Sequence, residues 1–186
     1  DSKEGLEMFD HAYEYFSAIG YQAGNVLAGI SKASAYFLAK DYQRAAKEAE
    51  STLELAEKTE SLTNIWRLEL LRGDSLLKLG HQDIAEKAYR HAQSVVDLLS
   101  GTMVSDEAKI RFGTGKEAIT QGLVDIDLKN EDYIKLFEDM ERGRARAFVS
   151  MLAAKQVGSE TSHPEIKLIK ALDADILAIR QRKNSL

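Results

Sequence analysis

The sequence predicts an all-α protein, a right-handed α-solenoid of antiparallel helix pairs, on three observations. Apolar residues recur at helical spacing along nearly the whole chain, and no segment alternates polar and apolar residues as a half-buried strand would. Only one proline occurs among 186 residues, which favours long helices. Equivalent positions of one helical unit recur every forty residues, with small residues at Gly5, Ala45 and Ala85, followed in register by Phe9, Ala49 and Tyr89. Units of this length cannot bury their apolar faces alone and must stack on neighbours.

This recurrence divides the chain into a helical repeat domain over residues 1–155, a linker and a C-terminal helix. The repeat domain consists of a half-repeat at 1–20 and three repeats at 21–60, 61–100 and 104–155. The polar stretch 156–163 is the predicted linker, and residues 164–186 carry an apolar stripe at helical spacing. Because a terminal repeat must cover its outer face, we expect the C-terminal helix to cap the solenoid. Packing on a further domain or on another copy of the chain stays open.

The predicted helices are separated by short turns. A first helix over residues 2–18 ends before Gly20, because glycine enters the left-handed conformation without a Cβ clash and suits a helix C-terminus. The helix pairs that follow are predicted at 22–39 with 42–58, at 62–79 with 82–99, and at 107–128 with 132–155. Short turns make the two helices of a pair antiparallel neighbours. We expect the turn of the third pair to be one residue longer than the others.

Composition and charge narrow the classes of function. The net charge is −5 and the basic residues are interleaved with acidic ones, so no basic stripe favours a nucleic acid or an anionic membrane as partner. The chain has no cysteine, which removes disulfides and thiol nucleophiles and fits a reducing compartment, and we therefore predict a cytoplasmic location. The sequence contains no run of eighteen apolar residues, so it predicts no membrane span.

The residues that could carry catalysis do not combine into a site. The four histidines, His11, His81, His91 and His163, lack the helical spacing that would put two imidazoles on one face to bind a metal. Asp125 and Asp127 are two residues apart, which points them to different sides of a helix. The stretch GTGK at 113–116 lacks the first glycine and the hydroxyl of a phosphate-binding loop. We therefore predict a chain that is not an enzyme and that holds no cofactor or metal.

A binding surface is predicted on the first helices of the pairs. Successive pairs of a solenoid rotate slightly, so that these helices line a concave surface. The residues assigned to it are Leu27, Ile30, Ser34, Phe37, Arg67, Leu70, Asp74, Lys78, Gln121 and Asp125. Their mixture of apolar and charged side chains suits an extended peptide or a helix of a partner protein. The C-terminal segment of the chain itself is an alternative occupant.

The second unit resembles a tetratricopeptide repeat. Small residues at helix contacts and a glycine at the turn characterise this family, and the corresponding positions are Gly73, Leu76, Gly80, Ala85, Tyr89 and Ala92. The first unit departs from the pattern, because Lys40 replaces the turn glycine and Thr52 the last alanine. The resemblance implies a module that binds other proteins or peptides.

The third unit has a second resemblance. The stretch Phe137–Lys155, and above all its core Glu141–Phe148, is similar to the last repeat before the caspase-like domain of proteins that join tetratricopeptide repeats to a CHAT domain. This implies a regulatory or scaffolding arm of a larger protein with a peptidase domain, whereas the chain itself has no cysteine nucleophile. The alternative is a free-standing adaptor that assembles partner proteins.

The arginines of this core have two interpretations. Arg142, Arg144 and Arg146 either form a solvated charged face with nearby glutamates or contact the linked domain or a partner carboxylate. A guanidinium presents a planar fork of donors that suits such a carboxylate.

Overall fold

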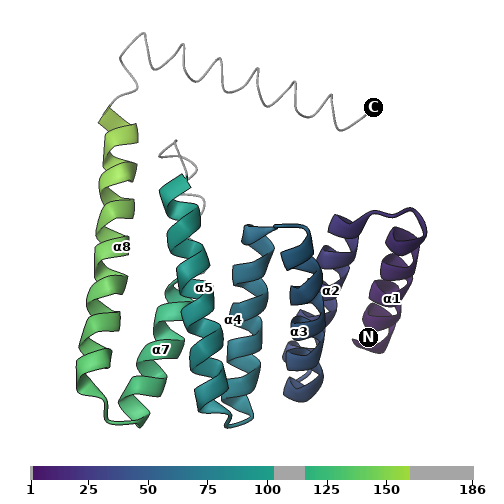
Figure 1. Ribbon diagram of the computed structural model, residues 1–186, viewed down its shortest axis with the longest axis horizontal. Coiled ribbons are helices and arrows are strands. Elements are labelled where there is room, and N and C mark those ends of the chain that lie inside the picture. Colours follow the sequence, from purple (N-terminus) through teal and green to yellow (C-terminus); the bar gives the residue numbers. More distant parts are fainter. Residues whose placement is uncertain (1, 103–115, 160–186) are drawn as a thin grey trace. The chain divides into compact units, whose positions relative to one another are not determined.

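The computed structural model describes residues 2–102 and 116–159, which contain helices and no strand. The helices are α1 (Ser2–Ala18), α2 (Gln22–Leu38), α3 (Tyr42–Lys58), α4 (Leu62–Lys78), α5 (Gln82–Thr102), α7 (Glu117–Lys129) and α8 (Tyr133–Ser159), as Figure 1 shows. The predicted all-α class is therefore confirmed over the described residues. The predicted helical segment 107–115 and the predicted C-terminal helix lie outside them.

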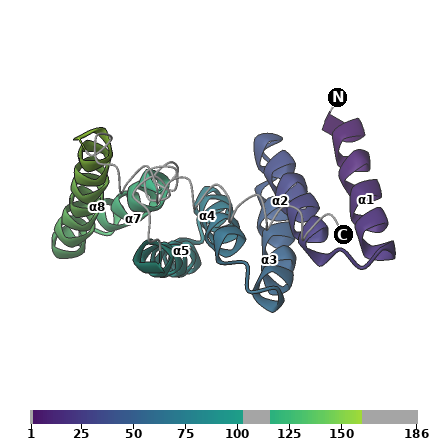
Figure 2. The ribbon, with the colours of Figure 1, turned by 90° about the horizontal axis from the view of Figure 1, so that it is seen from above.

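The chain forms two compact parts. The first part comprises residues 1–103 and 114–144, and the second part comprises residues 104–113 and 145–186. Within the first part each helix packs on the next in chain order from α1 to α7, and α4 also contacts both α2 and α7. Figure 2 shows α3 and α5 together on one side of the row that α2, α4 and α7 form. This sequential packing is the architecture of a helical repeat solenoid.

A left-handed residue ends each of the first four helices and α7. The φ angles are 70° at Gly20, 61° at Lys40, 51° at Glu60, 84° at Gly80 and 55° at Glu131. After each, the next amide donates to a carbonyl five residues back, as from Asp41 to Tyr36 and from His81 to Leu76, both 2.9 Å. This is the Schellman closure, which satisfies carbonyls that the helix end leaves free. The first four helices are 17 residues each, which explains the forty-residue repeat.

The largest differences from the predicted boundaries are in the second and third helix pairs. The third pair was expected to have a longer turn, but Asp132 donates to Asp127 at 2.9 Å in the same closure, so its turn matches the other two. Helix α5 continues to Thr102, and α8 continues to Ser159, so that the first four residues of the predicted linker are helical. Polar composition alone does not end a helix when no proline blocks its hydrogen bonds.

The non-glycine turn residues give a first prediction. Replacing Lys40 by glycine is expected to raise the free energy of unfolding by about 0.5–1 kcal/mol, because a residue with a Cβ is strained in the left-handed conformation. The exposed Lys47 in the middle of α3 offers the matched control, where glycine should instead cost about 1 kcal/mol. Urea denaturation of both variants measures the two signs, and a loss of stability in Lys40→Gly would contradict the turn assignment.

The predicted alternation of small and large residues forms the core of the first compact part. Ala33, Ala45 and Ala85 are 0% exposed, so the helix backbones approach closely at these positions. Large side chains fill the spaces beside them, and Tyr89, from α5, is only 1% exposed. Close contact between small and large residues is the packing that native interiors require.

Candidate functional site

Helices α2, α4 and α7 are neighbours, and we call their common exposed surface the first-helix face. None of the ten residues that the sequence assigns to it is buried, and Leu27 and Arg67 are among the five exposed ones. Other residues of the same helices point into the core, since Val26, Leu68 and Leu123 are 0% exposed. The face is thus accessible along α2, α4 and α7.

The part of the face on α2 is mainly apolar. Leu27 is 51% exposed and Phe37 lies edge-on to Tyr42, with ring centroids 5.4 Å apart. The hydroxyl of Ser34 donates to the carbonyl of Ile30 on its own helix at 2.8 Å, so it is internally satisfied. Sequence reasoning missed Leu38, which is 81% exposed, although it stands forty residues before Lys78 and the repeat register could have found it.

The side chain of Tyr89 joins the second and third units beneath the face. It comes from α5, and its ring lies against Gly73 of α4 and Gly122 of α7. A Cβ atom added to Gly73 would lie 2.8 Å from the ring, and one added to Gly122 would overlap it. The close approach of the Tyr89 ring therefore requires glycine at both positions, and the ring acts as the spacer between α4 and α7.

The hydroxyl of Tyr89 donates a hydrogen bond to Asp74 Oδ1 at 2.7 Å. Burial raises the pKa of Tyr89, and the bond to Asp74 and the negative charges of Asp74 and Asp125 raise it further. Burial also raises the pKa of Asp74, against the opposing effects of the Tyr89 bond and of Lys78. The tyrosine is therefore a neutral donor that holds Asp74 in place at the border between α4 and α7.

The α4 and α7 part of the face is polar and contains both signs of charge. Gln121 donates to Asp125 Oδ1 at 2.6 Å, so the amide orients this exposed carboxylate. The guanidinium of Arg67 lies 5.7 Å from the ring centroid of Trp66, within the range of a cation–π contact. Together with the apolar part on α2, these groups offer an extended ligand two different chemical environments.

A second polar cluster, which the sequence did not reveal, joins α5, α7 and α8. Arg90 donates to Asp139 Oδ1 at 2.6 Å and lies 4.0 Å from Asp127 Oδ2. Asp127 and Asp139 are 1% and 2% exposed. Burial raises the pKa of Asp127 to about 6, and its hydrogen bond with Asp139 contributes in the same direction. Arg90 thus lies within ion-pair distance of both buried carboxylates. The contrast between buried Asp127 and exposed Asp125 confirms that the two carboxylates point to different sides.

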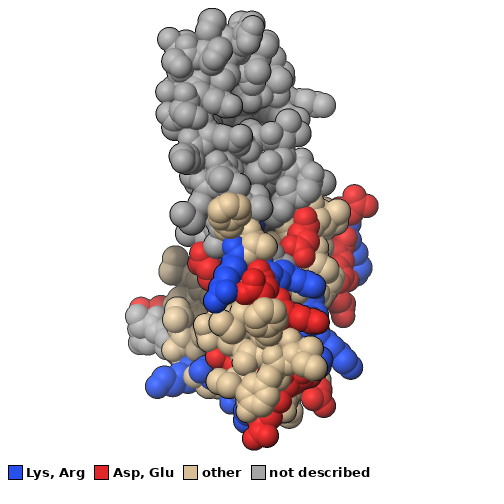
Figure 3. Space-filling view, turned by 90° about the vertical axis from the view of Figure 1, so that its left-hand side faces the viewer, with Lys and Arg blue, Asp and Glu red and all other residues tan. Residues whose placement is uncertain are grey.

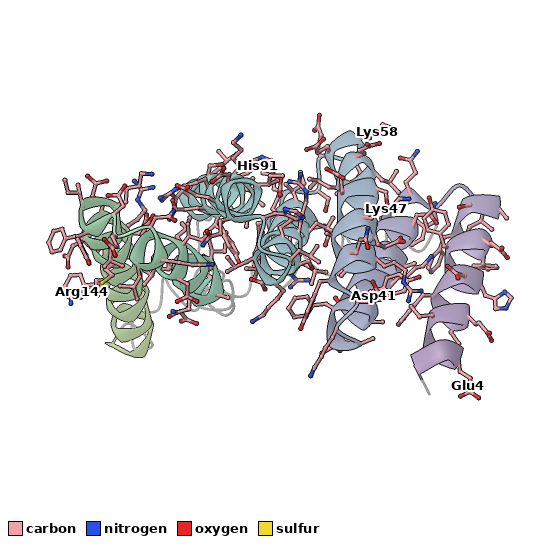
Figure 4. All side chains as sticks on the ribbon, turned by 90° about the horizontal axis from the view of Figure 1, so that it is seen from below. Glu4, Asp41, Lys47, Lys58, His91 and Arg144 are labelled. Atoms are coloured by element: carbon pink, nitrogen blue, oxygen red, sulfur yellow. The ribbon has the colours of Figure 1, made fainter. Side chains whose placement is uncertain are left out.

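His91, Arg142 and Arg144 each contact another side chain of the described helices. His91 Nδ1 lies 2.7 Å from Oε1 of Glu69, a buried residue of α4 (Figure 4). Arg142 donates to Gln93 Oε1 on α5 at 2.9 Å, and Arg144 pairs with Glu141 at 2.7 Å on the exposed side of α8. The side chain of Arg146 lies outside the described residues. Among the three predicted docking arginines, Arg142 is thus engaged within the stack.

Comparisons with known proteins leave the family open, because no family model and no curated protein matches the chain. Within the described ranges 2–102 and 116–159, no helix is long and apolar enough to cross a membrane. The same part of the chain contains no cluster of three or more histidine and acidic side chains that could hold a metal ion.

Proposed function

We propose that this chain is a protein–protein interaction module of the tetratricopeptide-repeat type, which binds a peptide or helix of a partner protein on the first-helix face. The observation that carries the proposal is the accessibility of all ten assigned residues on three adjacent helices. An extended ligand crossing these helices would meet apolar side chains on α2 and charged ones on α4 and α7. Such a combination of apolar anchors and oriented polar groups is what specific recognition requires.

We further propose a setting for this module, a regulatory or scaffolding arm of a larger cytoplasmic protein with a caspase-like peptidase domain. The similarity of Glu141–Phe148 to the repeat before CHAT domains supports it. A free-standing adaptor is the second candidate. The coding sequence beyond Leu186 separates the two, because a histidine and a cysteine at strand ends would support the linked peptidase. A stop codon or further repeats would support the adaptor.

The binding proposal is tested by selecting a display library of random peptides on the immobilised chain. We expect enriched peptides to carry a carboxylate, and we expect the double variant Arg67→Glu/Lys78→Glu to bind them at least about tenfold more weakly through like-charge repulsion. The matched control is Lys47→Glu/Lys58→Glu, which makes the same change on exposed residues of α3 (Figure 4). Absence of enriched peptides, or an equal loss in the control, would argue against the first-helix face as the binding surface.

A further inference from the structure

The side of α8 that points away from α5 and α7 carries exposed apolar residues. Ile134 is 76% exposed, Phe137 is 65% exposed and Phe148 is 61% exposed. Figure 3, viewed from the side of α8, shows uncharged residues gathered among acidic and basic ones on this side. Several large apolar side chains exposed in a row on one helix indicate a surface that another molecule or segment covers.

Comparison with the preceding units shows that two of these residues, Ile134 and Phe148, are particular to α8. Counted from the left-handed residue of each turn, Phe148 stands where α3 has Glu57 and α5 has Asp97. Ile134 likewise stands where both earlier helices have polar residues. The repeat architecture itself therefore does not require apolar side chains at the positions of Ile134 and Phe148, and their presence there indicates an interaction particular to α8.

Four residues of this surface form a stripe with symmetric spacing. Phe137, Glu141, Arg144 and Phe148 are separated by four, three and four residues, the spacing of a coiled-coil seam along one continuous helix. The side chains of Glu141 and Arg144 are 45% and 71% exposed, so the charges at the centre of the stripe are accessible. When the helix is read from its C-terminal end, the spacing is the same and a phenylalanine again stands at each end of the stripe. The glutamate and the arginine have exchanged positions. We call these four residues the α8 stripe.

We propose that the α8 stripe binds the α8 stripe of a second copy of this chain in antiparallel orientation. In that register Glu141 faces Arg144 of the second copy, and the twofold symmetry forms the pair twice. Each Phe137 meets Phe148 of the other copy, so the exposed rings cover one another. A parallel arrangement would place like charges opposite each other and is disfavoured. This surface is separate from the first-helix face, and the inference does not depend on the proposed function.

Light scattering coupled to gel filtration of the full chain tests the pairing. The wild type is expected to have the mass of two copies. Glu141→Arg and Arg144→Glu each place like charges across the interface and should weaken association by at least about tenfold. The double variant Glu141→Arg/Arg144→Glu restores opposite charges and should regain the two-copy mass.

A mixture of the two single variants provides the sharpest result. Each variant alone repels its own copies, but the Glu141→Arg chain presents two arginines in the stripe and the Arg144→Glu chain presents two glutamates. The mixture should therefore form a one-to-one complex. The charge pair within each α8 cannot produce this rescue, since both variants disrupt it. Lys47→Glu, on α3, is the control for the change in net charge and should keep the wild-type mass.

Several results would overturn the proposal. One is a wild-type chain with the mass of a single copy at every concentration tested, and another is a dimer that survives both charge reversals. A third is a wild-type monomer that becomes a dimer on Ile169→Asp/Ile176→Asp, which would assign the α8 stripe to the chain's own C-terminal segment. A single-copy wild type that binds an added partner protein through these residues would likewise replace the second copy as occupant.

Discussion

Replacing Tyr89 by alanine is expected to lower the free energy of unfolding by about 3–5 kcal/mol, the usual cost of deleting a fully buried aromatic side chain. The ring is 1% exposed and lies against backbone on two helices, at Gly73 and Gly122. Glycines have no side chains that could move into the cavity, so the site cannot collapse easily. Urea denaturation followed by circular dichroism gives the difference in stability.

Two further variants separate the contributions of the ring and the hydroxyl. Tyr89→Phe keeps the ring and removes the hydrogen bond to Asp74, so we expect a loss of only about 1 kcal/mol. Tyr133→Ala changes a side chain that is 63% exposed and should alter stability by less than about 0.5 kcal/mol. The spacer role of Tyr89 would be refuted if Tyr89→Ala were no more destabilising than Tyr133→Ala.

The stability of the protein should also depend on the protonation of Asp127. Its pKa is raised on folding from 3.8 to about 6, so the folded chain binds the proton more tightly than the unfolded chain does. The stabilisation is fully present below pH 3.8 and is lost as the pH rises through about 6. Because one unit of pKa difference corresponds to about 1.4 kcal/mol, we expect this group to remove on the order of 2 kcal/mol between pH 4 and pH 7.

The variant Asp127→Asn isolates this contribution, because an amide mimics the protonated carboxyl and does not titrate. The variant should be close to the wild type in stability near pH 4 and more stable than it at pH 7, as measured by urea denaturation at a series of pH values. Ile126→Val, one residue away and equally buried, is the control, since its difference from the wild type should not change with pH. A constant difference for Asp127→Asn would mean that the carboxyl is not protonated in the folded chain.

The first four helices could be predicted from the sequence almost to the residue. The bounds of α1 and α3 match, and α2 and α4 end one residue before their predicted ends. The reason is that these four helices have the same length and each is followed by a left-handed turn residue. The position of one helix boundary therefore indicates the positions of the others. Glycine is dispensable for this closure, as Lys40 and Glu60 show.

The interior of the third unit could not be predicted in the same way. Gly122 meets Tyr89 across two units, and no local pattern links residues 33 positions apart on different helices. The sequence placed Asp127 only on a different side of its helix from Asp125, because the periodicity separates the two sides without showing which side α8 covers. The buried contact with Arg90 and Asp139 requires the packing of three helices, which only the structure supplies.

The position of Tyr89 between Gly73 and Gly122 bears on how the array unfolds. A solenoid behaves as a row of units whose cooperativity depends on the coupling between neighbours. If α7 separated from α4, one side of the aromatic ring would face water, and the second unit would lose part of its own core at the same moment. The junction therefore couples the two units, and we expect the second unit and the described part of the third unit to unfold in a single transition.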